Sequence, residues 1–251
     1  MTPLDAPSTG FEKMDTAEPT ELLLVAADER ELAGLLSHCR NIVRLGWPLN
    51  FASTAEVNGR TWLLVANGWG SARATAAFDV AFTERRPAAC VSTGFCGALD
   101  PSLKAGDIFI AQSVEDSNRS SSYEARLPGY CGPAAYGKLV TLDHVAQTAE
   151  QKRLLFEQGW QAVDMEALGV AARAYSSGIP FFCVRVVTDL ATESLRLDFN
   201  LCKKNGLPSR AALLHQALTR PYPVGLELVK LYKRSRLASK TLGDFLASCR
   251  F

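Results

Sequence analysis

Two carboxylates, Glu166 and Asp189, lie at the ends of neighbouring predicted elements. A helix is predicted to begin beside Glu166, and Gly178 followed by Pro180 is typical of a helix end. The apolar run of residues 181–187 predicts a strand buried on both faces that ends just before Asp189. A helix of about twelve residues spans roughly 18 Å and a strand of about six roughly 20 Å, so the two can pack antiparallel with matched ends. The carboxylates then meet at the sheet edge where open α/β folds bind ligands, and paired carboxyl groups suit general acid–base chemistry.

A third carboxylate, Glu31, follows a predicted buried strand at residues 22–26. Asp28 and Glu31 form a D-x-x-E capping box, which predicts that a helix begins at this point. The helix carries three apolar residues at core spacing: Leu32, Leu35 and Leu36. Glu31 is therefore either only the partner of Asp28 in the capping box or a carboxylate that also takes part in chemistry.

The other predicted elements complete an α/β domain. In chain order they are strands at residues 51–57 and 61–66, an alanine-rich helix from its cap Ser71 to about Glu84, strands at 88–93, 108–114 and 139–142, and a loop of residues 115–135 over the site. Asn58-Gly59 is a strong hairpin signal between the first two strands. The Gly-bearing stretch of residues 94–101 is predicted to be a loop. The helix beside Glu166 shows helical spacing of Met165, Leu168, Ala172 and Tyr175.

The chain resembles the nucleoside phosphorylase and nucleosidase superfamily over roughly residues 21–200. The resemblance rests on Val163-Asp164-Met165-Glu166-Ala167, on Gly178-Ile179-Pro180-Phe181 and on Arg185-Val186-Val187-Thr188-Asp189-Leu190-Ala191. A second signature, Thr-Gly-x-x-Gly followed by Leu-x-Pro-x-Leu-Lys-x-Gly-Asp, spans Thr93 to Asp107. The resemblance implies a phosphorylase/hydrolase-like, three-layer α/β/α fold with a central mixed β-sheet, and a homodimer.

Cleavage of an N-ribosidic bond develops positive charge on the sugar and negative charge on the leaving base. By resemblance, Asp189 serves N7 of a purine, Glu166 binds ribose hydroxyls and Glu31 activates water. The resemblance also implies a substrate-binding set around these acids: Met165 beside the sugar, Phe95, Cys96 and Gly97 in the glycine-bearing stretch, and Val145 and Ala146 against the purine. No cofactor is implied.

Each of these residues also has a purely structural interpretation. Glu166 can complement a helix dipole in a first helical turn, and Asp189 can cap a following turn. Met165 is by default a core residue. The three histidines are scattered along the chain and indicate no metal site: His38, His144 and His215.

The glycine-bearing stretch favours hydrolysis over phosphorolysis. A phosphorylase needs fixed donors for an anion, typically Arg and Ser. Where bacterial phosphorylases of the superfamily carry arginine and serine around the first glycine, this chain has Ser92 and Phe95. Phe95 also replaces the serine usual in methylthioadenosine nucleosidases and predicts a more apolar pocket.

The C-terminal segment predicts a basic, helical extension at about residues 221–251. Residues 220–251 interleave apolar side chains with basic ones: Leu226, Val229, Leu231, Leu237, Leu242 and Phe245 with Lys230, Lys233, Arg234, Arg236 and Lys240. The extension and Phe95 together resemble the hopanoid-associated members of the superfamily, which release adenine from adenosylhopane. The two interpretations of the extension are peripheral membrane contact and an ordinary solvated helix.

Length, composition and charge indicate the number of domains, the kind of partner and the cellular compartment. The chain has 251 residues, 47% hydrophobic content and a net charge of +1, which predicts one catalytic domain at residues 20–251 after a disordered leader at 1–19, and no nucleic-acid partner. Seven cysteines without a C-x-x-C pair, and an N-terminus without signal-peptide features, predict a cytoplasmic protein.

The sequence thus predicts an N-glycosyl hydrolase that releases adenine from an adenosyl compound, with adenosylhopane as the first choice. The enzyme alternatives are a methylthioadenosine/S-adenosylhomocysteine nucleosidase and a purine nucleoside phosphorylase. An alternative of another class is a non-catalytic relative that binds or stores nucleosides, against which the presence of Glu31, Glu166 and Asp189 argues.

Overall fold

The computed structural model describes residues 21–129, 132–195, 203–204, 207–208 and 221–251. The predicted leader, residues 1–19, lies outside these ranges. So does the side chain of Leu226, since α6 is described there by its backbone alone.

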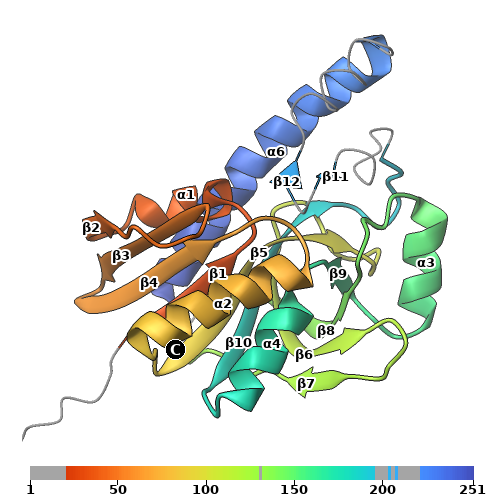
Figure 1. Ribbon diagram of the computed structural model, residues 1–251. Helices are drawn as coiled ribbons and strands as arrows, with labels where there is room; N and C mark the ends of the chain where they lie inside the picture. The colour runs from red at the N-terminus through yellow and green to blue at the C-terminus, as the bar shows by residue number, and fades with distance from the viewer. Residues whose placement is uncertain (1–20, 130–131, 196–202, 205–206, 209–220) are drawn as a thin grey trace, which may run out of the picture.

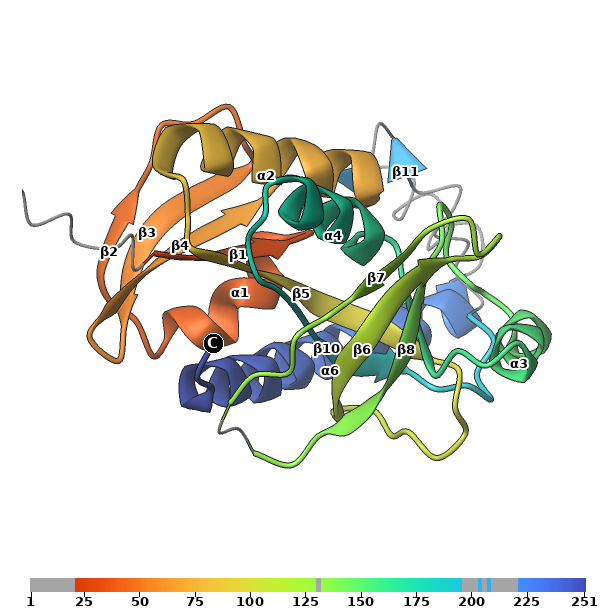
Figure 2. The same ribbon diagram turned by 90° about the horizontal axis from the view of Figure 1, so that it is seen from below.

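Helices cover both faces of one central sheet (Figures 1 and 2). One face carries α2 and α4, and the other carries α1 and α6. These helices, with α3 at the periphery, are α1 (Glu29–Leu36), α2 (Ser71–Arg85), α3 (Ala149–Glu157), α4 (Ala167–Ser176) and α6 (Pro221–Ser248). The predicted three-layer α/β/α fold is confirmed.

The central sheet is mixed, as predicted. Its strand order is β10-β6-β8-β9-β5-β1-β4-β3-β2, with β7 paired to β6. The strands are β1 (Leu22–Ala26), β2 (Arg40–Arg44), β3 (Phe51–Val57), β4 (Arg60–Ala66), β5 (Ala89–Ala98), β6 (Ile108–Asp116), β7 (Ser122–Glu124), β8 (Ala135–Thr141), β9 (Ala162–Asp164) and β10 (Phe181–Asp189). A separate short hairpin pairs β11 (Lys203–Lys204) with β12 (Leu207–Pro208).

Part of the sheet closes on itself. Strand β10 pairs with β5 as well as with β6, so β5, β10, β6, β8 and β9 form a ring. Strands β1, β5 and β10 run parallel, with Val25 level with Ser92 and Asp189 level with Gly97. Because parallel strands end at the same edge of a sheet, this arrangement carries the segments after β1 and β10 to a common edge.

Several predicted elements are confirmed, and their local chemistry explains them. Asn58 and Gly59 both have positive φ, 51° and 75°, as a two-residue hairpin turn with the right twist requires. The capping box of Asp28 and Glu31 is present at the start of α1. Gly178 has φ 68° and lies just after the end of α4.

Other predictions are wrong in detail. Residues 94–98 are the end of β5, not a loop, because β10 and β9 pair with them. Ser71 is the first residue of α2 and not its cap, since Gly70 holds the cap position and the Ser71 hydroxyl donates to the Met165 carbonyl. Tyr175 is 68% exposed, so it is not part of the buried face of α4. That face consists of Ala167, Val170, Ala171 and Ala174.

Six of the described elements were not predicted: β2, β7, α3, β9 and the two strands of the short hairpin, β11 and β12. The short β7 lies inside the predicted loop of residues 115–135 and pairs with β6. Helix α3 begins at a capping box of Thr148 and Gln151, a signal that was present in the sequence. Strand β9 has only three residues, and its pairing with β5 and β8 supports it.

Helix α6 is part of the core over its second half. Leu242 and Phe245, predicted as free apolar anchors, are buried with Ala238 and Leu246 against α1 and the sheet, so that prediction is wrong for these two residues. Among the described residues, no helix is long and apolar enough to cross a membrane.

The backbones of α1 and α6 touch where they cross. A Cβ atom added to Gly34 would lie 1.9 Å from the Ser239 carbonyl oxygen, and one added to Gly243 would lie 2.1 Å from the Gly34 carbonyl carbon. Any side chain at either position must therefore push the helices apart. The crossing fixes α6 to the helix that carries Glu31.

Replacing Gly243 by Ala should destabilise the protein, although alanine is the better helix former. Overpacking at this crossing should lower the free energy of unfolding by about 3 kcal/mol and the melting temperature by roughly 6–12 °C. Thermal denaturation measures the effect. Gly46→Ala is the control, because nothing lies within 4 Å of a Cβ atom there. A Gly243→Ala variant that melts at or above the wild-type temperature would show that the helices do not touch.

Candidate active site

Glu31 lies in the first turn of α1 with both carboxylate oxygens bound to main-chain donors. Oε2 accepts hydrogen bonds from Ala27 N (2.8 Å) and Asp28 N (3.3 Å). Oε1 accepts from Phe95 N of β5 (3.2 Å). The capping role is therefore real, but the side chain also reaches across to the sheet.

Burial raises the pKa of Glu31 above its ordinary value, and the bond from Phe95 N opposes the shift. The carboxylate lies so close to β5 that a Cβ atom on Gly94, at φ 132°, would approach Oε2 to 2.7 Å. Among the described residues, Oε1 accepts only the hydrogen bond from Phe95 N. This oxygen lies at the edge of β5 and can accept one more hydrogen bond.

A buried ion pair between Arg185 and Asp164 forms the base of the site. The Arg185 guanidinium donates to Asp164 Oδ2 from NH2 (2.6 Å) and from Nε (3.2 Å), and both side chains are inaccessible to solvent. Asp164 also accepts from Thr141 Oγ1 (2.6 Å) and from Ala167 N (2.9 Å), the first residue of α4. Asp164, and not Glu166, therefore caps α4.

Glu166 stands at the cap position of α4, but its side chain turns away from the helix. Its Oε1 accepts from Gly70 N of the turn before α2 (2.7 Å), and Oε2 accepts from Met165 N (3.3 Å). Burial, then the charges of Asp164 and Glu31, raise the pKa of Glu166 to about 8. The interpretation of Glu166 as a surface acid that complements the helix dipole is therefore wrong.

Asp189 is the last residue of β10 and lies beside the end of β5. A Cβ atom on Gly97 would lie 2.9 Å from Asp189 Oδ2, so only glycine allows this approach. Oδ2 accepts from Lys152 Nζ (2.6 Å), and Oδ1 accepts from Thr188 Oγ1 (3.1 Å). Thr188 Oγ1 also lies 3.2 Å from the Cys96 carbonyl oxygen.

Lys152 is a site residue that the sequence analysis missed. Its side chain is fully buried, and Nζ also donates to the carbonyls of Leu190 (2.9 Å) and Glu193 (3.2 Å). The three ammonium protons therefore match three acceptors. The only local signal was a lysine among the polar residues of α3, because its partner is 37 positions away.

The structure brings two of the three predicted acids, Glu31 and Asp189, to one stretch of β5, residues 94–97, and places Glu166 near Glu31. Glu31 contacts its first half, Asp189 contacts Gly97, and Glu31 is close enough to Glu166 to raise its pKa. Met165 is partly buried beside Glu166.

The other predicted binding residues differ in accessibility. Cys96 is buried, and burial raises the pKa of its thiol well above the ordinary value, so the thiol is no nucleophile. Phe95 packs partly buried against the cluster under α1 and α6. Ala146 is buried in a separate cluster with Leu142 and Trp160, whereas Val145 is partly exposed. The contacts of Ala146 therefore favour the core over the site.

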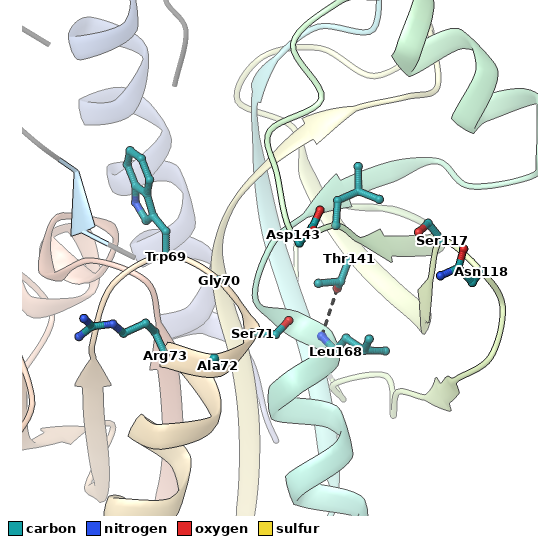
Figure 3. Close-up of a pocket in the computed structure, with 11 residues that line it drawn as sticks. Trp69, Gly70, Ser71, Ala72, Arg73, Ser117, Asn118, Thr141, Asp143 and Leu168 are labelled. Carbon is teal, nitrogen blue, oxygen red and sulfur yellow. Dashed lines mark hydrogen bonds between the residues drawn. The ribbon is translucent and has the colours of Figure 1, made fainter. Parts of the chain in front are cut away.

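A cleft of about 560 Å³ opens beside Glu166. Its lining residues come from four segments: Trp69, Gly70, Ser71, Ala72 and Arg73; Ser117 and Asn118; Thr141, Leu142 and Asp143; and Leu168 (Figure 3). Gly70, which binds Glu166, and Leu168, whose N–H donates to Thr141 Oγ1, connect the cleft to the acidic cluster. Within the described part of the predicted loop of residues 115–135, Ser117 and Asn118 line the cleft.

Ser92, expected at a former phosphate position, is fully buried and accepts a hydrogen bond from Arg185 NH2 (2.8 Å). The Arg185 guanidinium is in turn bound to Asp164 and to the Val184 carbonyl. Neither side chain is exposed for an anion to reach.

The family follows from comparison with known proteins. The sequence model of the phosphorylase superfamily matches residues 21–142 and 131–219 of the chain. The chain belongs to the phosphorylase superfamily. The predicted superfamily is therefore confirmed.

This superfamily member is 26% identical to a 5'-methylthioadenosine/S-adenosylhomocysteine nucleosidase of Staphylococcus aureus over 175 residues, which are 58% of this chain and 76% of the relative. Its fold is similar to that of the same kind of nucleosidase from Neisseria meningitidis in complex with methylthio-immucillin-A (TM-score 0.68, 18% identity, 91% of this chain and 97% of that chain). It is also similar to a futalosine hydrolase of Helicobacter pylori (TM-score 0.69, 14% identity, 92% and 97%). The predicted enzyme class, an N-glycosyl hydrolase, is confirmed, since the chain belongs to this superfamily and its Staphylococcus aureus relative is a nucleosidase.

Glu166→Gln should stabilise the protein at alkaline pH. The folded-state pKa of about 8 lies above the ordinary 4.5, so the contribution of this group to stability is full below about pH 4.5 and is lost as the pH rises through about 8. The uncharged variant should therefore gain about 2 kcal/mol at pH 9, less than the full shift implies because the side chain is partly exposed. Thermal melting should rise by roughly 5 °C at pH 9 and match the wild type at pH 4.5.

Glu157→Gln is the control for this measurement, because the carboxylate of Glu157 is exposed and pairs with Arg153 at the surface. It should show no such pH-dependent difference. An equal gain for Glu166→Gln at pH 4.5 and pH 9 would contradict an electrostatic origin.

Proposed function

We propose that this chain hydrolyses the N-ribosidic bond of an adenosyl compound and releases adenine. The observation that carries the proposal is that Glu31 and Asp189 both lie against residues 94–97 of β5, and that Glu31 is close enough to Glu166 to raise its pKa. In the reaction, a water oxygen bonds to the ribose C1′ while the bond from C1′ to the purine breaks and its electron pair leaves with the base. One proton leaves the water and one reaches the base, so the site needs an acceptor and a donor.

Glu31 is proposed to accept the proton of the attacking water. Three main-chain donors hold its carboxylate in one orientation, and Oε1 has a position left for the water. Burial raises the pKa of Glu31, and a carboxylate with a raised pKa is a stronger base. The proton on Glu31 returns to solvent after the reaction.

Asp189 is proposed to take up a proton from solvent, to donate it in a hydrogen bond to N7 of the purine and to transfer it to the base as the bond to C1′ breaks, which leaves the carboxylate ionised beside Lys152. Lys152 occupies Oδ2 and fixes the carboxylate, so Oδ1, which accepts from Thr188 Oγ1, is the oxygen proposed to carry the proton. Glu166 is proposed to bind ribose hydroxyls with Met165 packed beside the sugar, and Phe95, Cys96 and Gly97 to line the base site with Val145 and Ala146. For Ala146 this role requires main-chain contact, because its side chain is buried in the core.

Two observations support hydrolysis over phosphorolysis. Ser92 and Arg185 bind each other in the interior, and the Phe95 main chain is bound to Glu31. A phosphate would therefore find no free donors at these positions, whereas a water needs only Glu31.

The group on the ribose 5′ carbon is proposed to be a lipid, as in adenosylhopane. The feature that supports it is an exposed face of α6 with three apolar residues, Val229, Tyr232 and Leu237, and two basic ones, Lys233 and Arg236. Such a mixed face suits peripheral contact with an anionic membrane. The rival substrates are the small adenosyl thioethers of the methylthioadenosine/S-adenosylhomocysteine nucleosidases. A homodimer of a single domain, residues 20–251, is proposed as the working form.

The test of the reaction is the release of adenine from an adenosyl thioether or adenosylhopane with and without phosphate. Adenine should form at the same rate in both, together with a ribose that keeps its 5′ substituent and carries a hydroxyl group at C1. Asp189→Asn should lower kcat by about 10²-fold to 10⁴-fold, the usual contribution of a general acid or base. A 5-substituted ribose 1-phosphate in proportion to adenine would establish phosphorolysis, and binding of the nucleoside without turnover would establish the non-catalytic alternative. Glu157→Gln again serves as the control.

The test of the membrane contact is co-sedimentation of the full chain with anionic vesicles. Among the described residues, Lys230, Arg234 and Lys240 already have acidic partners, so Lys233 and Arg236 remain. At about 1 kcal/mol for each basic residue, their contribution is about 2 kcal/mol and weakens with salt. Replacing Val229, Tyr232 and Leu237 by Ser should abolish binding. Truncation after Pro221 is unsuitable, because it removes core residues of α6. Intact protein that stays in the supernatant at low salt would favour the small thioethers.

A further inference from the structure

Two basic residues of α6 bind one carboxylate near the end of β10. Arg234 meets Glu193 in a two-pronged contact, NH1 to Oε2 at 2.6 Å and NH2 to Oε1 at 3.0 Å. Lys230 Nζ adds a third bond to Oε1 at 2.8 Å. Each side chain of the Arg234–Glu193 pair is only 23% exposed. The pair is therefore better ordered than an ordinary surface ion pair.

Glu193 closes the turn that follows Asp189. Its Oε2 accepts from Leu190 N (3.2 Å), and its own N–H donates to the Leu190 carbonyl (3.1 Å). Both carbonyls of this turn, those of Leu190 and Glu193, accept from Lys152 Nζ, which binds Asp189 with its remaining proton. A continuous set of polar contacts thus runs from Arg234 through Glu193 and Lys152 to Asp189.

The position of helix α6, which carries Arg234, is fixed by its contacts with α1. Five residues after Arg234, the Ser239 hydroxyl accepts from Gly34 N of α1 (3.0 Å), and α1 and α6 then cross in backbone contact at Gly34 and Gly243. Helix α1 carries Glu31. Helix α6 therefore contacts both α1, which carries Glu31, and Glu193, which is linked to Asp189 through Lys152.

We propose that Arg234 is a positioning residue, which holds Asp189 in place through Glu193 and Lys152; the proposal rests on the function proposed above for Asp189. The role differs from a stabilising surface ion pair, because Arg234 restrains the turn whose carbonyls orient Lys152. The pKa of Glu193 is lowered to about 2, and the hydrogen bonds from Arg234 are the largest cause. The carboxylate therefore stays charged at any working pH. A misplacement of reacting groups of about 1 Å can reduce turnover about a hundredfold.

Steady-state kinetics of the full-length chain test the proposal. Arg234→Gln should lower kcat about tenfold to a hundredfold with KM changed less than about twofold, since binding of the substrate is kept and orientation is lost. Arg234→Lys should restore part of kcat. Glu193→Gln keeps the shape of the side chain and should likewise lower kcat while KM changes little. The proposal can therefore still be tested if Arg234→Gln does not fold. Lys240→Gln, which breaks an exposed ion pair with Asp244 on the same helix, is the matched control.

Modification of lysines in the folded protein, read by mass spectrometry, gives a readout that does not depend on turnover. Lys152 is fully buried and should resist an amine reagent in the wild type and in Lys240→Gln, but should react in Arg234→Gln. Unchanged kcat and a protected Lys152 in Arg234→Gln would overturn the proposal. A wild type that releases no adenine, while Lys152 still becomes reactive in Arg234→Gln, would overturn the proposed function and leave the structural link in place.

Discussion

The buried pair of Arg185 and Asp164 is the contact on which the rest of the site depends. It joins β10 to β9, and through Ser92 and Thr141 it also ties β5 and β8 to the same group of polar atoms. Two charges without solvent contact are stable only when each donor and acceptor is matched, and removal of one partner of such a pair usually costs about 3–5 kcal/mol. Because Asp164 also caps α4, the same pair sets the direction in which Glu166 leaves the helix.

Glycines set how closely the elements of the site approach one another. Gly94 and Gly97 of β5 leave room for the carboxylates of Glu31 and Asp189, and Gly34 with Gly243 lets α6 touch α1. At each position a methyl group would meet another atom at less than 3 Å. The acids of the site are therefore placed by backbone shape as much as by their own hydrogen bonds, which makes their separation insensitive to side-chain motion.

The electrostatics of the site work against stability. Glu166 is held near both Glu31 and Asp164, and the raised pKa values of Glu31 and Glu166 mean that their ionised forms are unfavourable in the folded protein. Cations offset part of this: Arg185 beside Asp164 and Lys152 beside Asp189. Perturbed acids gathered at one sheet edge are typical of functional sites, where a substrate supplies the missing donors.

The sequence by itself determined the elements whose causes are local. Three such features depend on neighbouring residues and were predicted correctly: the capping box of Asp28 and Glu31, the hairpin at Asn58-Gly59 and the end of helix α4 before Gly178. The buried strand of residues 181–187 followed from its own apolar composition. The family resemblance also brought Glu31, Glu166 and Asp189 into one hypothesis, and the structure places Glu31 and Asp189 along a single stretch of β5.

Only the tertiary structure decided features that depend on distant partners. Residues 94–98 continue as a strand because β9 and β10 lie beside them, and Lys152 meets Asp189 through the packing of α3. Leu242 and Phe245 of α6 are core residues because α1 and the sheet cover them. An apolar stripe on a helix has the same sequence pattern whether a membrane or a protein core covers it, so periodicity alone does not distinguish the two. The covering surface belongs to another part of the chain, and only folding brings it there.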